Sequence, residues 1–121
     1  MLTSKRSNQV VLFAIGGCGY SKKAEMWPWL HTTQAAEAMA DQVAQWPDLY
    51  GCDGIDLDLE GNEIANNHTM ANIFIHFVRR VKEQNPAMYI TQPISAWPHP
   101  VTAVDMINTV GWNTQGQNLG T

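Results

Sequence analysis

Residues 53–60 combine two kinds of side chain in strict alternation. The acidic residues are Asp56, Asp58 and Glu60, and aliphatic residues occupy the positions between them: Ile55, Leu57 and Leu59. Because side chains on a β-strand point to alternate faces, this segment predicts a strand with acidic groups on one face and aliphatic groups on the other. Neighbouring carboxyl groups repel one another and cost free energy to remove from water. We therefore expect the acidic face to line a functional site.

Two further strands are expected in the chain. Residues 10–15 form a continuous apolar run that ends at Gly16-Gly17, which is typical of a strand buried on both faces of a parallel sheet. Residues 88–92 have the β-branched and aromatic content of another short strand, and Pro93 ends it. With the acidic segment between them, these runs predict three strands separated by longer connections.

Those connections carry helix patterns. Thr32 or Thr33 is a candidate N-cap for a helix that runs to about Trp46 and ends at Pro47. A second helix is predicted from apolar residues spaced three and four positions apart, and Pro86 lies just beyond its end. Its apolar positions are Met70, Ile73, Phe74, Phe77, Val78 and Val81.

Alternating strands and helices predict an α/β fold with a parallel sheet. An open doubly wound sheet and a closed barrel both satisfy this pattern. The acidic strand favours the barrel, because its polar face must line a site while its aliphatic face packs on helices. Catalytic groups of such barrels lie at the carboxyl ends of the strands, where Glu60 is expected.

Composition excludes several classes of partner. The 121 residues suffice for one domain with a buried core, since 45% are hydrophobic and only 15% are charged. The net charge of -4 argues against a nucleic-acid partner and against an anionic membrane surface. No apolar run is long enough to span a bilayer. The histidines lack metal-ligand spacing and no phosphate-binding loop is present, so neither a metal nor a cofactor is expected.

The cysteines and the compartment are less constrained. Cys18 follows one predicted strand and Cys52 precedes the next, which places them at opposite ends of a parallel sheet and predicts two free thiols. Residues 1–6 lack the apolar stretch of a signal peptide. The sequon Asn67-His68-Thr69 is a glycan acceptor only in a secreted protein, so the sequence leaves the compartment open.

The acidic strand resembles the D-x-x-D-x-D-x-E signature of family 18 glycoside hydrolases, the chitinase-like (β/α)8 TIM barrels, and every acidic position of the signature is filled. The first strand ends in a sequence similar to the family's S-x-G-G motif, with Ala14 in place of the serine that normally supports the acidic network. The resemblance implies the third, fourth and fifth strands of a barrel. A complete barrel needs about 250 residues. Residues 1–121 are therefore expected to be a partial catalytic domain of about three βα units. The exposed sheet edges of such a fragment are expected to make an isolated monomer unstable.

The resemblance also implies a mechanism and a substrate. The family uses a retaining, substrate-assisted mechanism in which the sugar's N-acetyl oxygen attacks the anomeric carbon. Glu60 corresponds to the general acid, which later acts as base toward water. Asp58 corresponds to the residue that orients the N-acetyl group, and Asp56 to the residue that shares a proton with it. The implied substrate is chitin or another oligosaccharide that contains N-acetylglucosamine.

Further residues are expected to contact that substrate. Trp97 is a candidate for stacking on a sugar ring and Gln92 for a hydrogen bond, and Gly17 is also expected to bind substrate. Trp27 and Trp29 are weaker candidates for stacking, and packing is the role expected for them. Asp53 has the opposite strand parity from the acidic face and is expected to be structural.

Other readings of the acidic strand remain. Within the same family, the alternatives are a carbohydrate-binding fragment without activity and an endo-N-acetylglucosaminidase acting on N-linked glycans. A solvent-facing edge strand with incidental acidic residues is a third possibility. Calcium binding is disfavoured, because an EF-hand loop beginning at Asp56 would need a bidentate glutamate where Asn67 stands.

Overall fold

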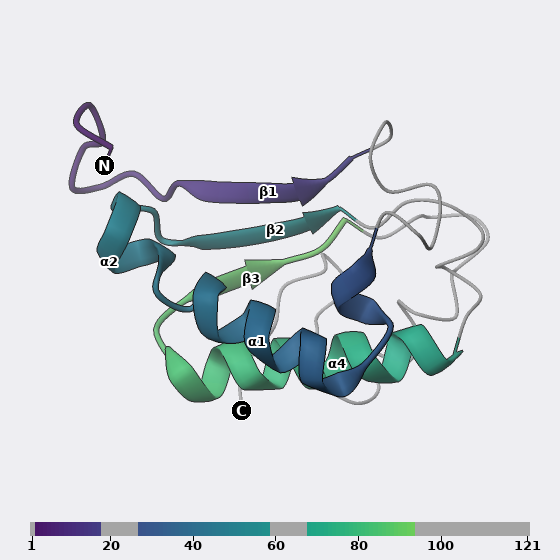
Figure 1. The fold of residues 1–121 in the computed structure, drawn as a ribbon. Helices are drawn as coiled ribbons and strands as arrows, with labels where there is room; N and C mark the ends of the chain where they lie inside the picture. The colour runs from purple at the N-terminus through teal and green to yellow at the C-terminus, as the bar shows by residue number, and fades with distance from the viewer. Residues whose placement is uncertain (1, 18–26, 59–67, 94–121) are drawn as a thin grey trace.

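Three strands form one parallel sheet whose spatial order follows the chain order. The computed structural model describes residues 2–17, 27–58 and 68–93. Its strands are β1 (Leu12–Gly16), β2 (Gly54–Asp58) and β3 (Tyr89–Thr91), and β2 lies between the other two (Figure 1). The predicted α/β class and all three strands are confirmed. Over the described residues the sheet is open, with β1 and β3 at its edges.

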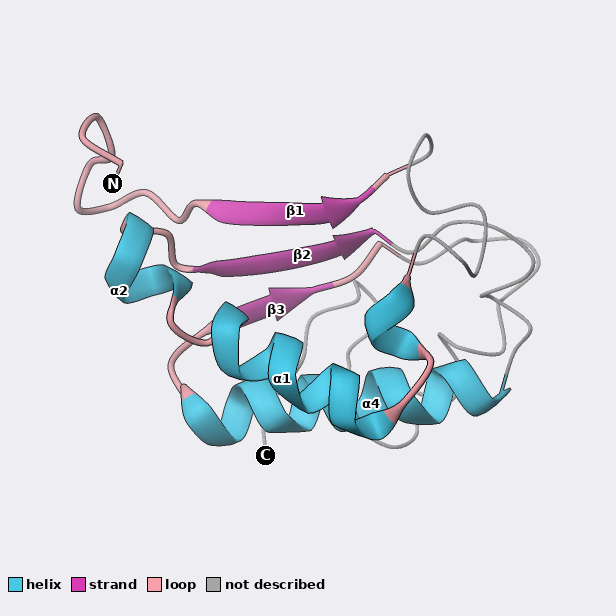
Figure 2. Ribbon diagram, in the orientation of Figure 1, coloured by secondary structure: helices cyan, strands magenta, loops and turns pink. Residues whose placement is uncertain are grey.

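The two long helices lie on the same side of this sheet (Figure 2). They are α1 (Thr33–Val43) and α4 (His68–Gln84), and they pack against each other. Thr32 is the N-cap of α1, because its side chain accepts a hydrogen bond from the Ala35 N–H at 3.1 Å. Of the two threonines considered as caps, the first is therefore correct.

Two short helical segments flank α1. The 3-10 helix η2 (Pro28–Leu30) precedes it, and α2 (Trp46–Tyr50) follows it. The expectation that Pro47 ends the first helix is wrong, because α1 already ends at Val43 and Pro47 lies in the first turn of α2. A proline in a first turn is tolerated there, since its missing N–H has no intrahelical partner in any case.

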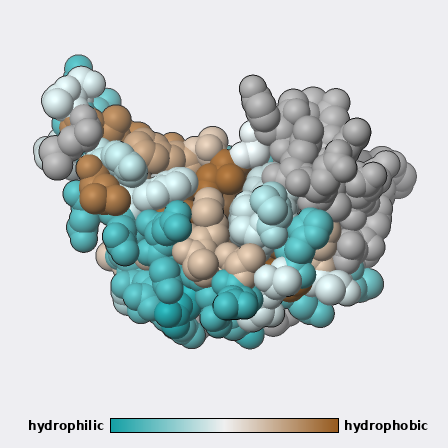
Figure 3. Space-filling view, in the orientation of Figure 1, coloured by the Kyte–Doolittle hydropathy of each residue, from teal (hydrophilic) through white to brown (hydrophobic). Residues whose placement is uncertain are grey.

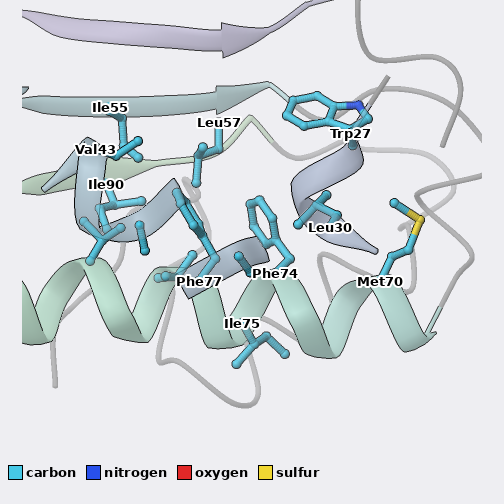
Figure 4. Packing of buried hydrophobic residues seen from close by; sticks show 14 of the residues in the cluster. Trp27, Leu30, Val43, Ile55, Leu57, Met70, Phe74, Ile75, Phe77 and Ile90 are labelled. Atoms are coloured by element: carbon cyan, nitrogen blue, oxygen red, sulfur yellow. The ribbon is translucent and has the colours of Figure 1, made fainter. Parts of the chain in front are cut away.

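The core lies between β2 and the helices. Figure 4 shows Ile55 and Leu57 pointing from β2 toward Phe74 and Phe77 of α4. Both aliphatic side chains are fully buried, and the two phenylalanine rings have centroids 6.2 Å apart. The predicted apolar face of α4 is confirmed, with Ile73 at its partly buried margin. The aliphatic face of the acidic strand therefore packs on a helix, as its alternation predicted.

The outer surfaces of the helices are polar and tied together by charge. Arg80 of α4 donates two hydrogen bonds to the Asp41 carboxylate of α1, at 2.8 and 3.2 Å. One turn earlier, His76 Nε2 lies 2.8 Å from Glu37 Oε1. The Arg80 hydrogen bond holds the pKa of Asp41 below its usual value.

The helical surface that carries these pairs is hydrophilic (Figure 3), whereas apolar residues, including Leu49, are exposed around α2. None of the helices described here has the length and apolar character needed to cross a membrane.

Asp53 fastens the start of β2 to the segment before β1. Its Oδ2 accepts a hydrogen bond from the Val11 N–H at 2.9 Å and lies 3.2 Å from Lys5 Nζ. The Val11 hydrogen bond, which outweighs the opposing effect of partial burial and is assisted by Lys5, holds the pKa of Asp53 below its usual value. The structural role expected for Asp53 is confirmed.

This contact predicts a specific acid sensitivity. A carboxyl group whose pKa is lower in the folded state than in the unfolded chain, where it is about 3.9, stabilises the fold above that pH. The stabilisation is lost as the pH falls through the folded-state pKa. We therefore expect Asp53→Asn to lower the urea midpoint of unfolding at pH 7. The urea midpoints at pH 7 and at pH 3 should also differ less in this variant than in the parent. Asp41→Asn should change the urea midpoint in the same direction. If the urea midpoint of Asp53→Asn depends on pH as strongly as that of the parent, Asp53 is not the stabilising group assigned here.

Candidate functional site at the carboxyl end of the sheet

The acidic face of β2 is the face that the described helices do not cover. Asp56 and Asp58 alternate with the buried Ile55 and Leu57, and both are partly buried. Along an extended strand they are two residues, or roughly 6.6 Å, apart. Asp58 is the last residue of β2, so the pair lies at the carboxyl end of a parallel sheet. The predicted separation of acidic and aliphatic residues onto opposite faces is confirmed for these positions.

The neighbouring strands give Asp56 two different flanks. The sheet register aligns Ala14 of β1 with Asp56 on one side and Thr91 of β3 with it on the other. The Thr91 hydroxyl donates a hydrogen bond to Asp56 Oδ1. Ala14 is exposed and offers only a methyl group. The sequence predicts Thr91 only as a strand residue and does not predict this contact. The signal that points to it is a hydroxyl group at an alternate strand position.

Two glycines adjoin Asp58. The Gly17 N–H donates to the Asp58 carbonyl oxygen at 3.0 Å, which extends the pairing of β1 and β2 past the last strand residue. Gly16 has a positive φ of 108° and no space for a side chain. A Cβ there would run into the Asp58 carbonyl oxygen and would lie 2.9 Å from Cη2 of Trp27. Glycine at position 16 therefore allows the Trp27 ring and the Asp58 backbone each to lie close to the end of β1.

Gly17 lies beside the Asp58 carboxyl group. A Cβ added to Gly17 would be 3.8 Å from Asp58 Oδ2, which is ordinary van der Waals distance. The φ of Gly17 is also positive, at 98°, so side chains other than glycine are strained there. This position keeps the backbone close to the carboxyl group without a side chain over it. The role of Gly17 in binding substrate stays a prediction.

The tryptophans before α1 pack in the core. Trp27 is 2% exposed and makes an edge-on contact with Trp29, with centroids 5.4 Å apart. Trp29 in turn lies 4.6 Å from the Phe77 ring centroid. The expectation that both are packing residues is confirmed. The Trp27 Nε1 atom is nevertheless buried without a hydrogen-bond partner in the described structure.

Gln92 shares this property. It directly follows β3, is 4% exposed, and its Oε1 is likewise buried without a hydrogen-bond partner in this part of the chain. A buried polar atom without a partner is costly, and functional sites are among the places where it occurs. The role of Gln92 as a hydrogen-bonding residue for substrate stays a prediction. Glu60 and Trp97 lie outside the described residues.

Other chemistry-bearing groups are few in the described ranges. Among residues 2–17, 27–58 and 68–93, no three His, Cys, Asp or Glu side chains are grouped so that they could hold a metal ion. Cys52 is a buried free thiol, and its burial raises the pKa of the thiol group. Cys52 is thus unpaired as predicted, while Cys18 lies outside the described residues.

Comparison with known proteins finds no match to a protein-family model, to a curated protein or to a solved structure. The likeness to family 18 glycoside hydrolases thus depends on the acidic strand and the glycine pair themselves. Within the described part of the site, the structure brings together Asp56, Asp58, Gly17 and Thr91 at one end of the sheet.

Proposed function

We propose that this chain is part of a family 18 glycoside hydrolase barrel and takes part in hydrolysis of β-1,4-linked N-acetylglucosamine polymers such as chitin. The observation that supports the proposal most is the pair Asp56 and Asp58, which lies at the carboxyl end of a central parallel strand, on the face away from the helices. Neighbouring carboxyl groups repel each other at a cost in free energy, and this cost supports a functional use for the pair.

The fold is compatible with that proposal. Parallel strands in sequential order, with helices on one side, form the repeating unit of a (β/α)8 barrel. In a barrel the acidic face of β2 would look into the interior, and both β1 and β3 would pair with further strands. Such strands would complete the domain to about 250 residues.

Each carboxyl group then has a distinct task. Glu60, two residues beyond Asp58, continues the alternation in sequence and would protonate the glycosidic oxygen. Asp58 would hold the substrate's N-acetyl group so that its oxygen attacks the anomeric carbon from the opposite side. The bond to the leaving sugar breaks as that carbon–oxygen bond forms, and Glu60 then removes a proton from the water that opens the cyclic intermediate. Asp56 would exchange a proton with Asp58 and keep it correctly oriented.

One observation favours a second function within the same family. Ala14 lacks the hydroxyl group that supports the acidic network in the family's motif, which would suit a carbohydrate-binding protein without turnover. Glu60 is present, however, and non-hydrolytic relatives usually lose that residue. Hydrolysis therefore leads, and an endo-acting enzyme on N-linked glycans is the closest variant of it.

The test combines binding and turnover. The purified chain would be titrated with chitin oligosaccharides by calorimetry and incubated with a fluorogenic chitooligosaccharide and with an N-linked glycopeptide. Cleavage of the chitin substrate supports the proposal, and cleavage of the glycopeptide alone redirects it to N-linked glycans. Binding without cleavage favours the carbohydrate-binding function. If the chain neither binds nor cleaves these substrates, the proposal is overturned for this chain.

A further inference from the structure

We infer that Thr91 is a positioning residue for Asp56 and supplies, from β3, the supporting hydroxyl group that Ala14 cannot supply from β1. The inference rests on the proposed function, because it assigns Thr91 a part in the same acidic site. It concerns a residue outside the acidic signature, on a different strand.

The sheet register carries the argument. Asp56 lies in the middle strand, so one residue from each edge strand is aligned with it, and these are Ala14 and Thr91. Neighbours in a parallel sheet direct their side chains to the same face. A hydroxyl group on either flank can therefore reach the Asp56 carboxyl group, and in this chain only the β3 flank has one. That hydroxyl donates to Asp56 Oδ1.

The contact fixes an otherwise adjustable group. The carboxyl group of an aspartate rotates readily about its terminal bond and accepts hydrogen bonds on both oxygens. With Oδ1 held by Thr91, the plane of the carboxyl group is set, and Oδ2 remains to serve other partners on that face. The next side chain on the face toward the carboxyl end is Asp58, the residue with which Asp56 is proposed to exchange a proton.

The alternative role for Thr91 is purely structural. A β-branched residue suits a strand, and Thr91 follows the buried Ile90 in β3. Thr91→Val separates the two roles, since valine keeps the branched shape and the strand propensity but removes the hydroxyl group. Thr91→Ser keeps the hydroxyl group and loses the methyl group.

The experiment measures kcat and KM for chitooligosaccharide hydrolysis by the full chain and its variants. We expect Thr91→Val to lower kcat roughly tenfold, the order of one lost hydrogen bond to a charged group. KM should change less than twofold, and Thr91→Ser should stay close to the parent. Adding Ala14→Ser to Thr91→Val should recover most of the lost kcat, because the new hydroxyl group lies on the opposite flank of Asp56. In an Asp56→Asn background, Thr91→Val should cost little more.

The opposite results are equally clear. Parental kcat in Thr91→Val would overturn the inference while leaving the proposed function in place. A kcat loss that is equally large in the Asp56→Asn background would also overturn it, since Thr91 would then act independently of Asp56. Circular dichroism spectra of the variants and the parent at the assay temperature show whether a loss of kcat comes from unfolding. If the chain without substitutions shows no turnover, the proposed hydrolysis and this inference are both overturned.

Discussion

Glu60→Gln is expected to lower chitooligosaccharide hydrolysis by roughly 10²- to 10⁴-fold, the usual contribution of a general acid. Glutamine has nearly the shape of glutamate, but its amide group has no acidic proton to transfer to the departing sugar oxygen. Binding of the oligosaccharide should remain within a few fold of the parent, because the contacts to the sugar rings are unchanged. The two quantities are measured by release of a fluorogenic leaving group and by calorimetry.

Glu63→Gln is the matched control for that substitution. It removes the same charge three residues further along the chain, outside the alternation that carries the acidic face. We expect it to hydrolyse at close to the parental rate. A Glu60→Gln variant that turned over as fast as the Glu63→Gln control would remove Glu60 from the role of general acid. Asp58→Asn should also lower the rate severely, since the N-acetyl group would lose the residue that orients it.

Phe77→Ala is expected to destabilise the fold by about 3–5 kcal/mol, the range for a buried phenylalanine truncated to alanine. Phe77 is fully buried on α4 and contacts both Trp29 and Phe74. Removing its ring leaves a cavity beneath β2, next to the side of the strand opposite Asp56. Because a small domain is stable by only about 5–15 kcal/mol, much of the folded population could be lost at moderate urea concentrations.

The measurement is urea unfolding followed by circular dichroism, with Tyr89→Ala as the control. Tyr89 is also aromatic and lies in β3, but it is 54% exposed. Its truncation should shift the unfolding free energy by about 1 kcal/mol or less, since exposed positions tolerate substitution. Equal shifts in the two variants would show that the cluster around Phe77 is not the main source of stability.

The sequence predicts the fold well where periodicity is strong. The spacing of apolar residues in α4 matches its buried face, because one face of a long helix must be apolar to pack on a sheet. The alternation in β2 likewise matches the division between Leu57 in the core and Asp58 on the opposite face. In both elements, each side chain's position follows from local geometry alone.

Predictions fail where a local signal has two structural meanings. Pro47 was expected to end a helix, but a proline is equally acceptable in the first turn of a new one, which is where it lies. The sequence could not locate the end of α1 at Val43, since no proline or glycine marks it.

The candidate site divides in the same way. The shared face of Asp56 and Asp58 follows from parity within one strand. The contact between Thr91 and Asp56 depends instead on the pairing of β2 with β3, which brings together residues 35 positions apart in the chain. Strand register is not encoded in any single segment, so this contact required the folded sheet.

Because its two faces differ in polarity, β2 is sensitive to insertions and deletions. Inserting or deleting one residue between Gly54 and Asp58 would exchange the two faces of the strand beyond that point. Carboxyl groups would then be pressed against the aromatic rings of α4, and aliphatic side chains would take their place at the open face. Foldability and chemistry would fail together. We therefore expect this strand to accept changes of residue type far more readily than changes of length.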